Sequence, residues 1–362
     1  MINKIIIVGS TGKLGSKLLS YTNKNLIPIY GISCFKNSKK LHKQKIKYSI
    51  KHSFVLSEKN YQNKFLKILE KKVKLIYFLD YGSFSLRYLN HFLNFNKNSY
   101  VAIANKEMII AGGTLLQDKI KKTDNKFIPL DSEHFSLINS KINNNIKKIY
   151  ITASGGPFYF KKNINLNSVK KNNVLSHPKW DMGTNNLIDS SNFINKILEI
   201  YELSHIYSIP LNKIDFLISK EAYVHSVVHF NDGTLSINCF TNNMLVTLIK
   251  PLRYIYNLSE SKLKQMYFEL NKLNLEKPND KRFPIFRIKK NLLRLSHSDQ
   301  IKLMIINNSA HKLYLSNKLK YNDIIKYIMS ELLKNRKNVN LNTFKKILNF
   351  INQYNNYYET NV

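Results

Sequence analysis

Two carboxylates stand two positions apart in the segment PLDSEH, directly after an apolar run typical of a β-strand. In an extended segment, Asp131 and Glu133 point to the same side, where they repel each other unless a cation lies between them. Ligands that are all oxygen suit hard ions, so this pair indicates a Mg²⁺ or Mn²⁺ site rather than a zinc site. A solvated acidic pair is the alternative, and it is less expected in a chain with 23 acidic and 57 basic residues.

The segment IDSSNFINKILEIYE carries further polar side chains on one face of a predicted helix. Asn195, Glu199 and Glu202 recur at intervals of four and three residues, and Lys196 lies beside Asn195. An amide and two carboxylates near an ammonium can complete a metal shell and bind a phosphate. An exposed helical face is the alternative.

Glycines repeat every third residue in IIIVGSTGKLG, where an apolar strand leads into a predicted helix. Gly9, Gly12 and Gly15 form a variant of the dinucleotide-binding turn, in which glycines let backbone N–H groups approach a pyrophosphate. The alternative is an ordinary turn. After the second predicted strand there is no acidic residue to hold the ribose 2′-hydroxyl of NAD. Lys36 stands there instead and favours the 2′-phosphate of NADPH, although an ordinary surface lysine has the same appearance.

Two loops complete the candidate site. In ITASGGPF, Ser154 and a pair of glycines offer donors for an anion. The loop LSHPKWDMG is bounded by proline and glycine and holds Trp180, the only tryptophan of the chain. A single tryptophan in such a loop favours a lid over the site.

The elements that position these residues follow from the hydrophobic pattern. Over the first 130 residues, β-branched runs alternate with amphipathic stretches, which predicts a parallel sheet covered by helices. The predicted strands of this sheet cover residues 4–8, 26–32, 75–79, 100–103 and 126–130. Farther on, Asn231-Asp232-Gly233 joins two alternating strands as a hairpin turn, and a helix over about 190–207 has Asp189 or Ser190 as its N-cap.

We therefore predict an α/β protein of three domains. Residues 1–130 form a Rossmann-like NADPH-binding domain. Residues 131–258 form an α+β catalytic and metal-binding domain, with a flexible lid near 177–187. Residues 259–362 form a helical domain, because the pattern there has a helical period.

The composition limits the class of partner. The net charge is +34, but nearly all the surplus is lysine scattered along the chain, whereas proteins that grip nucleic acids cluster their charge and use arginine. We expect no nucleic-acid partner, and no membrane partner, since no apolar run is long enough to cross a bilayer. Cys34 and Cys239 are expected to be buried free thiols of a cytoplasmic protein, or of a mature form after removal of a presequence.

Taken together, these strings resemble one family, the 1-deoxy-D-xylulose 5-phosphate (DXP) reductoisomerases. The matching strings are GSTGKLG, AIANKE, PLDSEH, ITASGGPF, HPKWDMG, IDSSNFINKILEIYE and VHSVVHFNDGTL, in the order of the family. The resemblance runs from the first strand to about residue 324. PLDSEH together with N-K-x-x-E is its most specific part.

The resemblance assigns roles at the matching positions. It implies cofactor contacts at Thr11, Gly12, Lys13, Leu14, Lys36, Asn37, Asn105, Glu107 and Gly183. It implies metal ligation by Asp131, Glu133 and Glu199, and these three with Lys106 are the predicted catalytic residues. It implies substrate contacts at Lys106, Ser132, Glu133, Ser154, His177, Ser190, Asn195, Lys196 and Glu199, with Trp180 and Met182 in the lid.

The implied reaction belongs to the non-mevalonate route to isoprenoid precursors. DXP is rearranged by a retro-aldol and an aldol step, and hydride from NADPH then gives 2-C-methyl-D-erythritol 4-phosphate. The resemblance also implies Mg²⁺ or Mn²⁺, with Co²⁺ as a further option, a phosphorylated sugar as substrate, and a homodimer.

Some positions depart from the family pattern. Thr184 and Asn185 stand where the lid usually has basic residues, Ser219 replaces a pocket histidine, and Leu245 replaces an arginine. Phe35 replaces a glycine before the adenosine contacts. We expect an active but slower enzyme.

Two other functions are alternatives. Another metal-assisted NADPH oxidoreductase would lack PLDSEH and N-K-x-x-E together. A catalytically degenerate, basic binding protein would show broken ligands or a concentrated lysine patch, and the sequence has neither.

Overall fold

The computed structural model describes residues 4–140, 142–143, 145–180, 182–256, 258, 273–334 and 338–360. The chain divides into two compact units. The first comprises Met1–Met108, Thr114–Ile138 and Asn243–Tyr267, and the second comprises Ile109–Gly113, Asn139–Asn242 and Phe268–Val362. The predicted three-domain boundaries stay predictions, and the start of the predicted helical domain, 259–272, lies outside the described residues.

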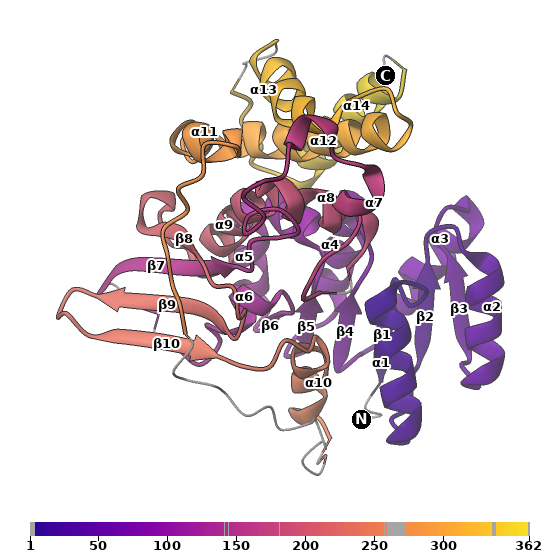
Figure 1. Ribbon diagram of the computed structural model, residues 1–362. Helices are drawn as coiled ribbons and strands as arrows, with labels where there is room; N and C mark the ends of the chain where they lie inside the picture. The colour runs from indigo at the N-terminus through magenta and orange to yellow at the C-terminus, as the bar shows by residue number, and fades with distance from the viewer. Residues whose placement is uncertain are drawn as a thin grey trace. The chain divides into compact units, whose positions relative to one another are not determined.

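The first unit is built on a six-stranded parallel sheet in the order β3-β2-β1-β4-β5-β6 (Figure 1). Its strands are β1 (Ile5–Val8), β2 (Gly31–Cys34), β3 (His52–Val55), β4 (Leu75–Phe78), β5 (Tyr100–Ile103) and β6 (Lys126–Pro129). All five strand pairings are parallel. The strand order reverses between β1 and β4, which is the point where such sheets bind ligands at the carboxyl ends of their strands.

Helices follow each strand of this sheet, as the alternation predicts. They are α1 (Lys13–Lys24), α2 (Ser38–Lys47), α3 (Lys59–Leu69), α4 (Leu86–Phe95), α5 (Lys106–Lys122), α6 (Ser132–Phe135) and the 3-10 helix η1 (Ser83–Ser85). A distant segment, α10 (Leu245–Arg253), completes the core. Its Leu248 and Leu252 are buried against strands β1 and β4, and the Tyr77 hydroxyl donates to the Leu248 carbonyl over 2.8 Å.

Two strands differ from the sequence prediction. The second strand begins at Gly31 rather than residue 26, because Leu26 takes a left-handed conformation (φ 52°) and Pro28 has no N–H to donate to a ladder. Strand β3 was not predicted. It is a four-residue edge strand whose first two residues are half-buried, so its hydrophobic signal is weak.

The second unit contains a four-stranded sheet in the order β10-β9-β7-β8. Its strands are β7 (Ile146–Ala153), β8 (Ile214–Ile218), β9 (Val224–Phe230) and β10 (Leu235–Cys239). The hairpin between β9 and β10 is confirmed, since Gly233 has φ 85° and the Phe230 N–H donates to the Thr234 carbonyl. Cys34 is buried as predicted, but the prediction for Cys239 is wrong, because alternate residues of the edge strand β10 are exposed.

Helices make up most of the rest of this unit, which agrees with the predicted helical C-terminal part. They are α7 (Lys171–Val174), α8 (Thr184–Asn192), α9 (Ile194–Tyr207), α11 (Pro284–Leu292), α12 (His297–Leu315), α13 (Ile324–Lys334) and α14 (Phe344–Thr360), with 3-10 helices η2 (Leu166–Ser168), η3 (Leu211–Lys213) and η5 (Tyr321–Asp323). In Figure 1, α12 and α13 lie together, as their contacts require. None of the described helices is both long enough and apolar enough to cross a bilayer.

The predicted helix over residues 190–207 is in fact two helices. Phe193 adopts a left-handed conformation (φ 67°) and separates α8 from α9. The predicted N-cap is therefore wrong, because Asp189 and Ser190 lie inside α8. The Asp189 carboxylate instead accepts hydrogen bonds from His311 (2.7 Å) and Asn307 (2.9 Å), both on the distant α12.

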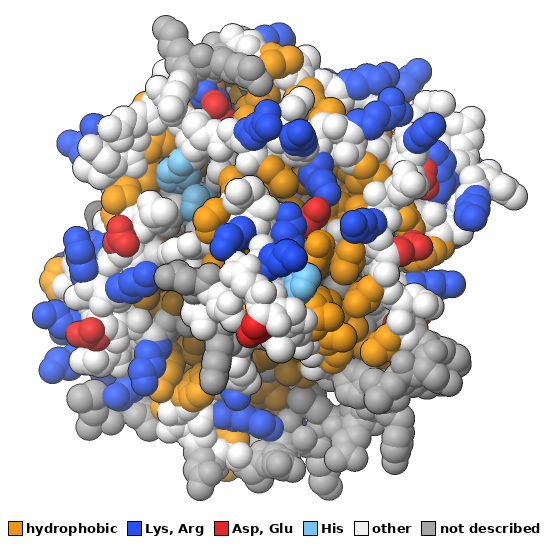
Figure 2. All heavy atoms as spheres, turned by 90° about the vertical axis from the view of Figure 1, so that its left-hand side faces the viewer, with side chains coloured by type: hydrophobic (Ala, Val, Ile, Leu, Met, Phe, Trp, Pro, Cys, Tyr) orange, Lys and Arg blue, Asp and Glu red, His pale blue; other side chains and the backbone are white. Residues whose placement is uncertain are grey.

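Positive charge is dispersed over the face that Figure 2 draws. Among the residues coloured there, Lys and Arg side chains are spread between polar and hydrophobic ones, with few acidic side chains. This distribution agrees with the scattered lysines of the sequence.

Candidate active site

The glycine turn after β1 has the geometry that a dinucleotide phosphate needs. Gly9 has φ 82°, and a Cβ at this position would lie 2.5 Å from the backbone nitrogen of Asp80. Gly15 packs as closely, because a Cβ there would lie 2.5 Å from the Gly9 carbonyl oxygen. Gly12 has ordinary φ and is exposed at the N-cap of α1. The N-terminus of α1 therefore meets the carboxyl ends of β1 and β4, where helix N–H groups and the helix dipole favour an anion.

A polar network that the sequence did not indicate joins β4 to α5. Asp80 follows β4 and accepts hydrogen bonds from the Ser85 hydroxyl and, over 3.2 Å, from the Asn105 amide. The same amide donates to the Gly82 carbonyl (2.8 Å), while its oxygen caps α5 by accepting from the Met108 N–H. Asn105 therefore fixes the start of α5, where Lys106 and Glu107 follow. Burial raises the pKa of Asp80 to about 6, against the lowering effect of these hydrogen bonds.

We expect the pH dependence of stability to reveal this half-buried carboxylate. Its pKa in the folded state lies above the ordinary value of 3.8, so its stabilising contribution is present below about pH 4 and lost as pH rises through about 6. Asp80→Asn removes this charge, and the stability of the variant relative to wild type should increase by up to about 3 kcal/mol between about pH 4 and about pH 7.5. Thermal unfolding at several pH values measures this, with Asp118→Asn, an exposed carboxylate of the same unit, as control. A difference between Asp80→Asn and wild type that stays constant with pH would contradict the assignment.

The loop after β2 holds the predicted adenosine contacts. Lys36 and Asn37 are exposed, and the Asn37 carboxamide oxygen caps α2 by accepting from the Lys40 N–H (3.1 Å). Phe35 is 52% exposed and makes an edge contact with Phe84 of η1, at 5.8 Å between ring centroids. The loops after β2 and β4 thus meet above the end of β1.

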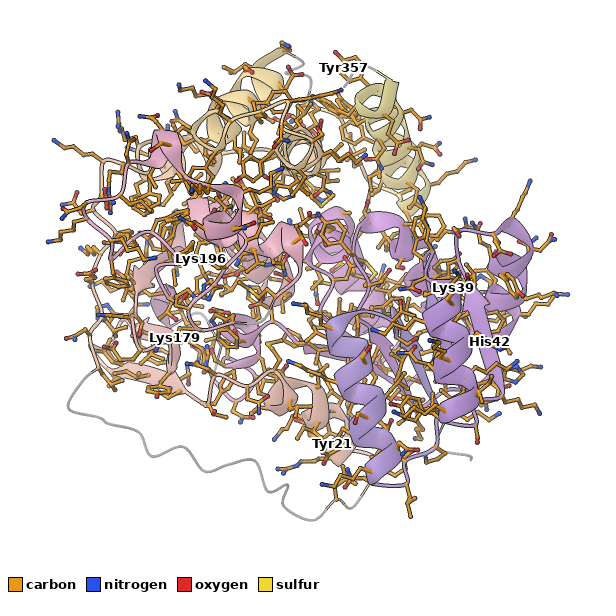
Figure 3. All side chains as sticks on the ribbon, turned by 45° about the vertical axis from the view of Figure 1, so that its right-hand side comes forward. Tyr21, Lys39, His42, Lys179, Lys196 and Tyr357 are labelled. Atoms are coloured by element: carbon orange, nitrogen blue, oxygen red, sulfur yellow. The ribbon has the colours of Figure 1, made fainter. Side chains whose placement is uncertain are left out.

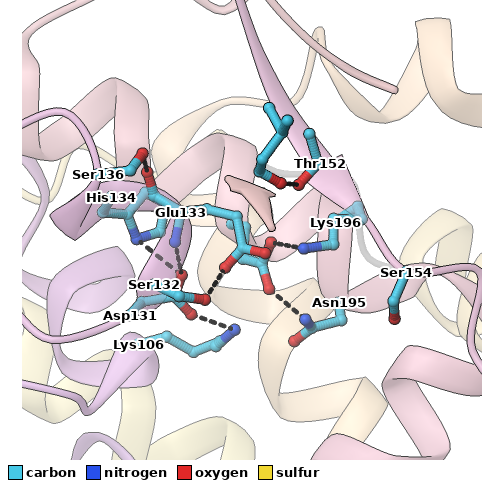
Figure 4. A network of polar contacts seen from close by, with 12 residues as sticks. Lys106, Asp131, Ser132, Glu133, His134, Ser136, Thr152, Ser154, Asn195 and Lys196 are labelled. Atoms are coloured by element: carbon cyan, nitrogen blue, oxygen red, sulfur yellow. Dashed lines mark hydrogen bonds and ion pairs between the residues drawn. The ribbon is translucent and has the colours of Figure 1, made fainter. Parts of the chain in front are cut away.

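The acidic pair of PLDSEH lies at the end of β6, but it is not extended. Asp131 is the N-cap of α6 and accepts from the Glu133 N–H (3.2 Å), so the two residues belong to a helix start. The expectation from an extended segment is therefore wrong. The buried Ser132 hydroxyl donates to Glu133 over 2.5 Å. Asp131 lies 3.6 Å from Lys106 Nζ and 3.6 Å from His134 Nδ1, which places two cationic or titratable groups beside one carboxylate (Figure 4).

In the second unit, the loop after β7 brings two predicted substrate contacts together. Gly155 and Gly156 both have positive φ, which makes a concave turn after Ser154. Gly156 fits closely against α8, because a Cβ there would lie 2.8 Å from the Ser190 carbonyl oxygen. Glycine is thus needed for the loop that carries Ser154 to approach Ser190.

His177 lies beside this loop in a defined tautomer. Its Nδ1 accepts from the N–H groups of Lys179 (3.1 Å) and Trp180 (3.0 Å), so in the neutral ring the proton is on Nε2. Nε2 then donates to the Ser154 hydroxyl oxygen over 3.1 Å, which leaves the hydroxyl proton for a ligand. Burial, and next the Lys196 charge, lower the pKa of His177 to about 4, so the ring is neutral at neutral pH.

The start of α9 concentrates the other predicted contacts. Glu199 is buried and accepts from the Asn195 amide with one oxygen and from the Lys196 ammonium with the other (Figure 4). The three side chains fall on one face because they are three and four residues apart. Lys196 is also buried, so this is a compact group of opposite charges rather than the exposed helical face that was the alternative.

The described residues of the predicted lid belong to the second unit. Trp180 and Met182 are half-buried, and Trp180 lies 6.2 Å from the ring of His225. Gly183 and Thr184 are exposed at the start of α8. Ser219 is buried, and its N–H donates to the Ala153 carbonyl directly before Ser154.

The fold and these two groups of side chains define a class of protein: a dinucleotide-dependent oxidoreductase with a carboxylate site and an anion-binding loop. Family models agree. The model described as the 1-deoxy-D-xylulose 5-phosphate reductoisomerase C-terminal domain matches residues 127–207, and that of the DXP reductoisomerase C-terminal domain matches residues 244–357. The reductoisomerase of Pelagibacter ubique is 35% identical over 353 residues, which cover 89% of each chain. That of a Sulfurihydrogenibium species is 30% identical, over 91% of each chain. The chain belongs to the DXP reductoisomerase family.

Solved structures share the fold. A DOX-P reductoisomerase in complex with NADPH, fosmidomycin and magnesium superposes with a TM-score of 0.85 at 21% identity, over 99% of this chain and 98% of that one. The Zymomonas mobilis enzyme in complex with NADPH gives a TM-score of 0.83 at 21% identity, over 99% of each chain.

Proposed function

We propose that this protein is an NADPH- and divalent-metal-dependent DXP reductoisomerase, which converts DXP to 2-C-methyl-D-erythritol 4-phosphate in the synthesis of isoprenoid precursors. This proposal rests mainly on membership of the DXP reductoisomerase family. The local observation that supports it most directly is the buried group of Asn195, Lys196 and Glu199, whose side chains are in contact.

Cofactor binding is assigned to the first unit. Thr11, Gly12, Lys13 and Leu14 face the pyrophosphate with the N-terminus of α1, while Lys36 and Asn37 meet the 2′-phosphate. The tight glycine geometry supports this, since Gly9 and Gly15 have no room for a Cβ and keep the turn compact. Asn105 acts mainly by holding the start of α5, from which Glu107 contributes to the cofactor site. Gly183, exposed before α8, stays a proposed contact. NADPH, when bound, supplies the hydride.

Metal ligation is assigned to Asp131 and Glu133 of the first unit and to Glu199 of the second, as the resemblance to the family implies. The donor set fits Mg²⁺ or Mn²⁺, with Co²⁺ as a further option, because all three donors are carboxylate oxygens. A divalent cation held there would supply positive charge that stabilises negative charge developing on substrate oxygens. Lys106 orients Asp131 and contacts the substrate, and the buried Ser132 holds Glu133 in place.

The substrate phosphate is assigned to the second unit. The Ser154 hydroxyl proton, the Ser190 hydroxyl, the Asn195 amide and the Lys196 ammonium are its donors, and neutral His177 keeps Ser154 oriented. Trp180 and Met182 close over the substrate and exclude water. Binding of the phosphate, which is remote from the reacting atoms, then provides energy that orders the reacting end of the substrate.

The proposal is tested by following NADPH oxidation at 340 nm with DXP and Mn²⁺ or Mg²⁺. We expect turnover that requires both DXP and the metal. A catalytically degenerate binding protein would still bind NADPH but show no DXP-dependent oxidation, and that result would overturn the proposal.

We also propose a homodimer in the cytoplasm. The edge strand β10 exposes Leu235 (61%) and Ile237 (53%) on one face, and a second copy would cover these apolar side chains. Free cysteines agree with a reducing compartment. Sedimentation equilibrium of the full chain tests the dimer, and a monomer at micromolar concentration would contradict it.

Lys36→Ala should reveal the cofactor preference. A lysine at a 2′-phosphate contributes about 1–3 kcal/mol as a charge-assisted contact, so the KM for NADPH should rise by about tenfold or more. The KM for NADH should barely change, because NADH lacks that phosphate. Steady-state kinetics with both cofactors measures the effect, and equal changes for the two would count against the role of Lys36.

A further inference from the structure

Lys40 is joined to the dinucleotide turn by a contact that the sequence did not indicate. It belongs to the first turn of α2, and its ammonium donates to the carbonyl oxygen of Thr11 over 2.7 Å. The side chain is exposed to solvent. An ammonium has three N–H groups, and the carbonyl uses one of them, so two are available to a ligand.

A neighbouring residue, Gln44, holds α2 against the dinucleotide turn independently of Lys40. Gln44, one turn farther along α2, is buried. It accepts from the Ser10 hydroxyl (2.8 Å) and donates to the Ser10 carbonyl (2.9 Å). Two buried hydrogen bonds therefore hold α2 against the turn, and the exposed Lys40 contact is not required for the fold. The position of Lys40 is thus better explained by a ligand than by stability.

The topology of the first unit indicates the charge of that ligand. In this fold the residues after β2 meet the 2′ position of the adenosine ribose. Lys36 and Asn37 stand there, directly before α2. By analogy with other phosphate monoesters, a 2′-phosphate carries close to two negative charges at neutral pH. Lys36 by itself would balance only one of them. The first turn of α2 has no acidic residue, so nothing on that turn offsets a second cation.

We propose that Lys40 is a second cationic determinant of NADPH over NADH, which contacts the 2′-phosphate from the junction between the Thr11 turn and the loop after β2. This inference rests on the proposed function, because it assumes that the cofactor is NADPH. Lys40 is not among the cofactor contacts that the family resemblance implies, and its contact can be tested by binding alone, without turnover.

The test is equilibrium binding to the full chain, measured by calorimetry with three probes: NADPH, NADH and 2′,5′-ADP. Lys40→Met should raise the Kd for NADPH and for 2′,5′-ADP by about tenfold. It should leave the Kd for NADH within about twofold. Lys40→Arg should recover most of the NADPH affinity, because it restores the charge.

The matched control is Lys39→Met, which removes the same charge from the adjacent, exposed position of α2 (Figure 3). Lys39→Met should leave all three Kd values within about twofold. This control distinguishes the loss of a direct contact from a general loss of positive charge near the cofactor. The melting temperature of Lys40→Met should equal that of wild type, since Gln44 keeps its contacts.

The results distinguish failure of the Lys40 contact from failure of the proposed function. If wild type binds NADPH tightly but Lys40→Met binds it as well as wild type does, the inference fails and the proposed function stands. Equal losses for NADPH and NADH would place Lys40 at the pyrophosphate and also overturn the inference. If wild type binds neither NADPH nor 2′,5′-ADP, both the proposed function and the inference fail.

Discussion

Asp131→Asn is expected to abolish DXP turnover, by about a thousandfold or more, while the Kd for NADPH stays within about twofold. The substitution removes the charge of a proposed metal ligand, and electrostatic stabilisation by a bound cation is worth several kcal/mol in such reactions. The fold should persist, because asparagine caps a helix as well as aspartate and can still accept from the Glu133 N–H. Single-turnover kinetics and NADPH calorimetry on the same preparation measure both quantities.

Asp118→Asn provides the matched control, since it removes an exposed carboxylate of the same unit. Its turnover should equal that of wild type. Metal-dependent turnover of Asp131→Asn at the wild-type rate would show that Asp131 is not a ligand. A parallel loss of NADPH binding would show that the substitution damages the first unit as a whole.

Gly9→Ala is expected to have the largest effect on stability. Its φ of 82° costs a residue with a Cβ about 1–2 kcal/mol, and the added methyl would meet the backbone of Asp80 at 2.5 Å, where no flexible side chain can move away. A total loss of about 3 kcal/mol corresponds to a fall of about 10 °C in the melting temperature of a unit of this size. Differential scanning calorimetry measures it, and NADPH binding should be lost at temperatures where the turn no longer forms.

Gly12→Ala is the comparison that separates stability from binding. A Cβ at Gly12 would lie 3.4 Å from the nearest backbone atom, and its φ is ordinary, so the melting temperature should change by no more than about 3 °C. The NADPH Kd should rise instead, because the methyl group would stand at the proposed pyrophosphate contact. Similar melting temperatures for Gly9→Ala and Gly12→Ala would contradict the geometric account of the turn.

Local sequence signals were sufficient for much of the fold. The apolar runs of β1, β4, β5 and β6 predicted their strands to within a residue at each end, and Asp232-Gly233 predicted a hairpin that the structure contains. Such signals depend on φ, ψ and side-chain periodicity over a few residues, so they can be recognised in a single sequence. The strands that were misplaced or missed are those with a weak local signal, as at Leu26 and at the edge strand β3.

The candidate site was found in part by chemistry and in part by resemblance. Spacing grouped Asn195, Glu199 and Glu202, with Lys196 beside Asn195, and the structure brings Asn195, Lys196 and Glu199 into contact. Spacing also paired Asp131 with Glu133, but the extended conformation assumed for them was wrong, because the chain starts a helix there. The roles of Asn105, Lys106 and His177 came only from the resemblance, since no local pattern distinguishes them from other polar residues.

By itself, the sequence determined the class of fold, the glycine turn, the family and the residue types of the site. Tertiary structure decided what those residues touch: Asp80 binds Asn105 across 25 positions, Lys40 binds Thr11 across 29, and His311 binds Asp189 across 122. Backbone conformation depends on near neighbours in the chain, whereas these contacts depend on which elements pack together, and that follows from burial of the whole core. The tautomer of His177 and the raised pKa of Asp80 are likewise consequences of packing, because burial and hydrogen-bond partners set them.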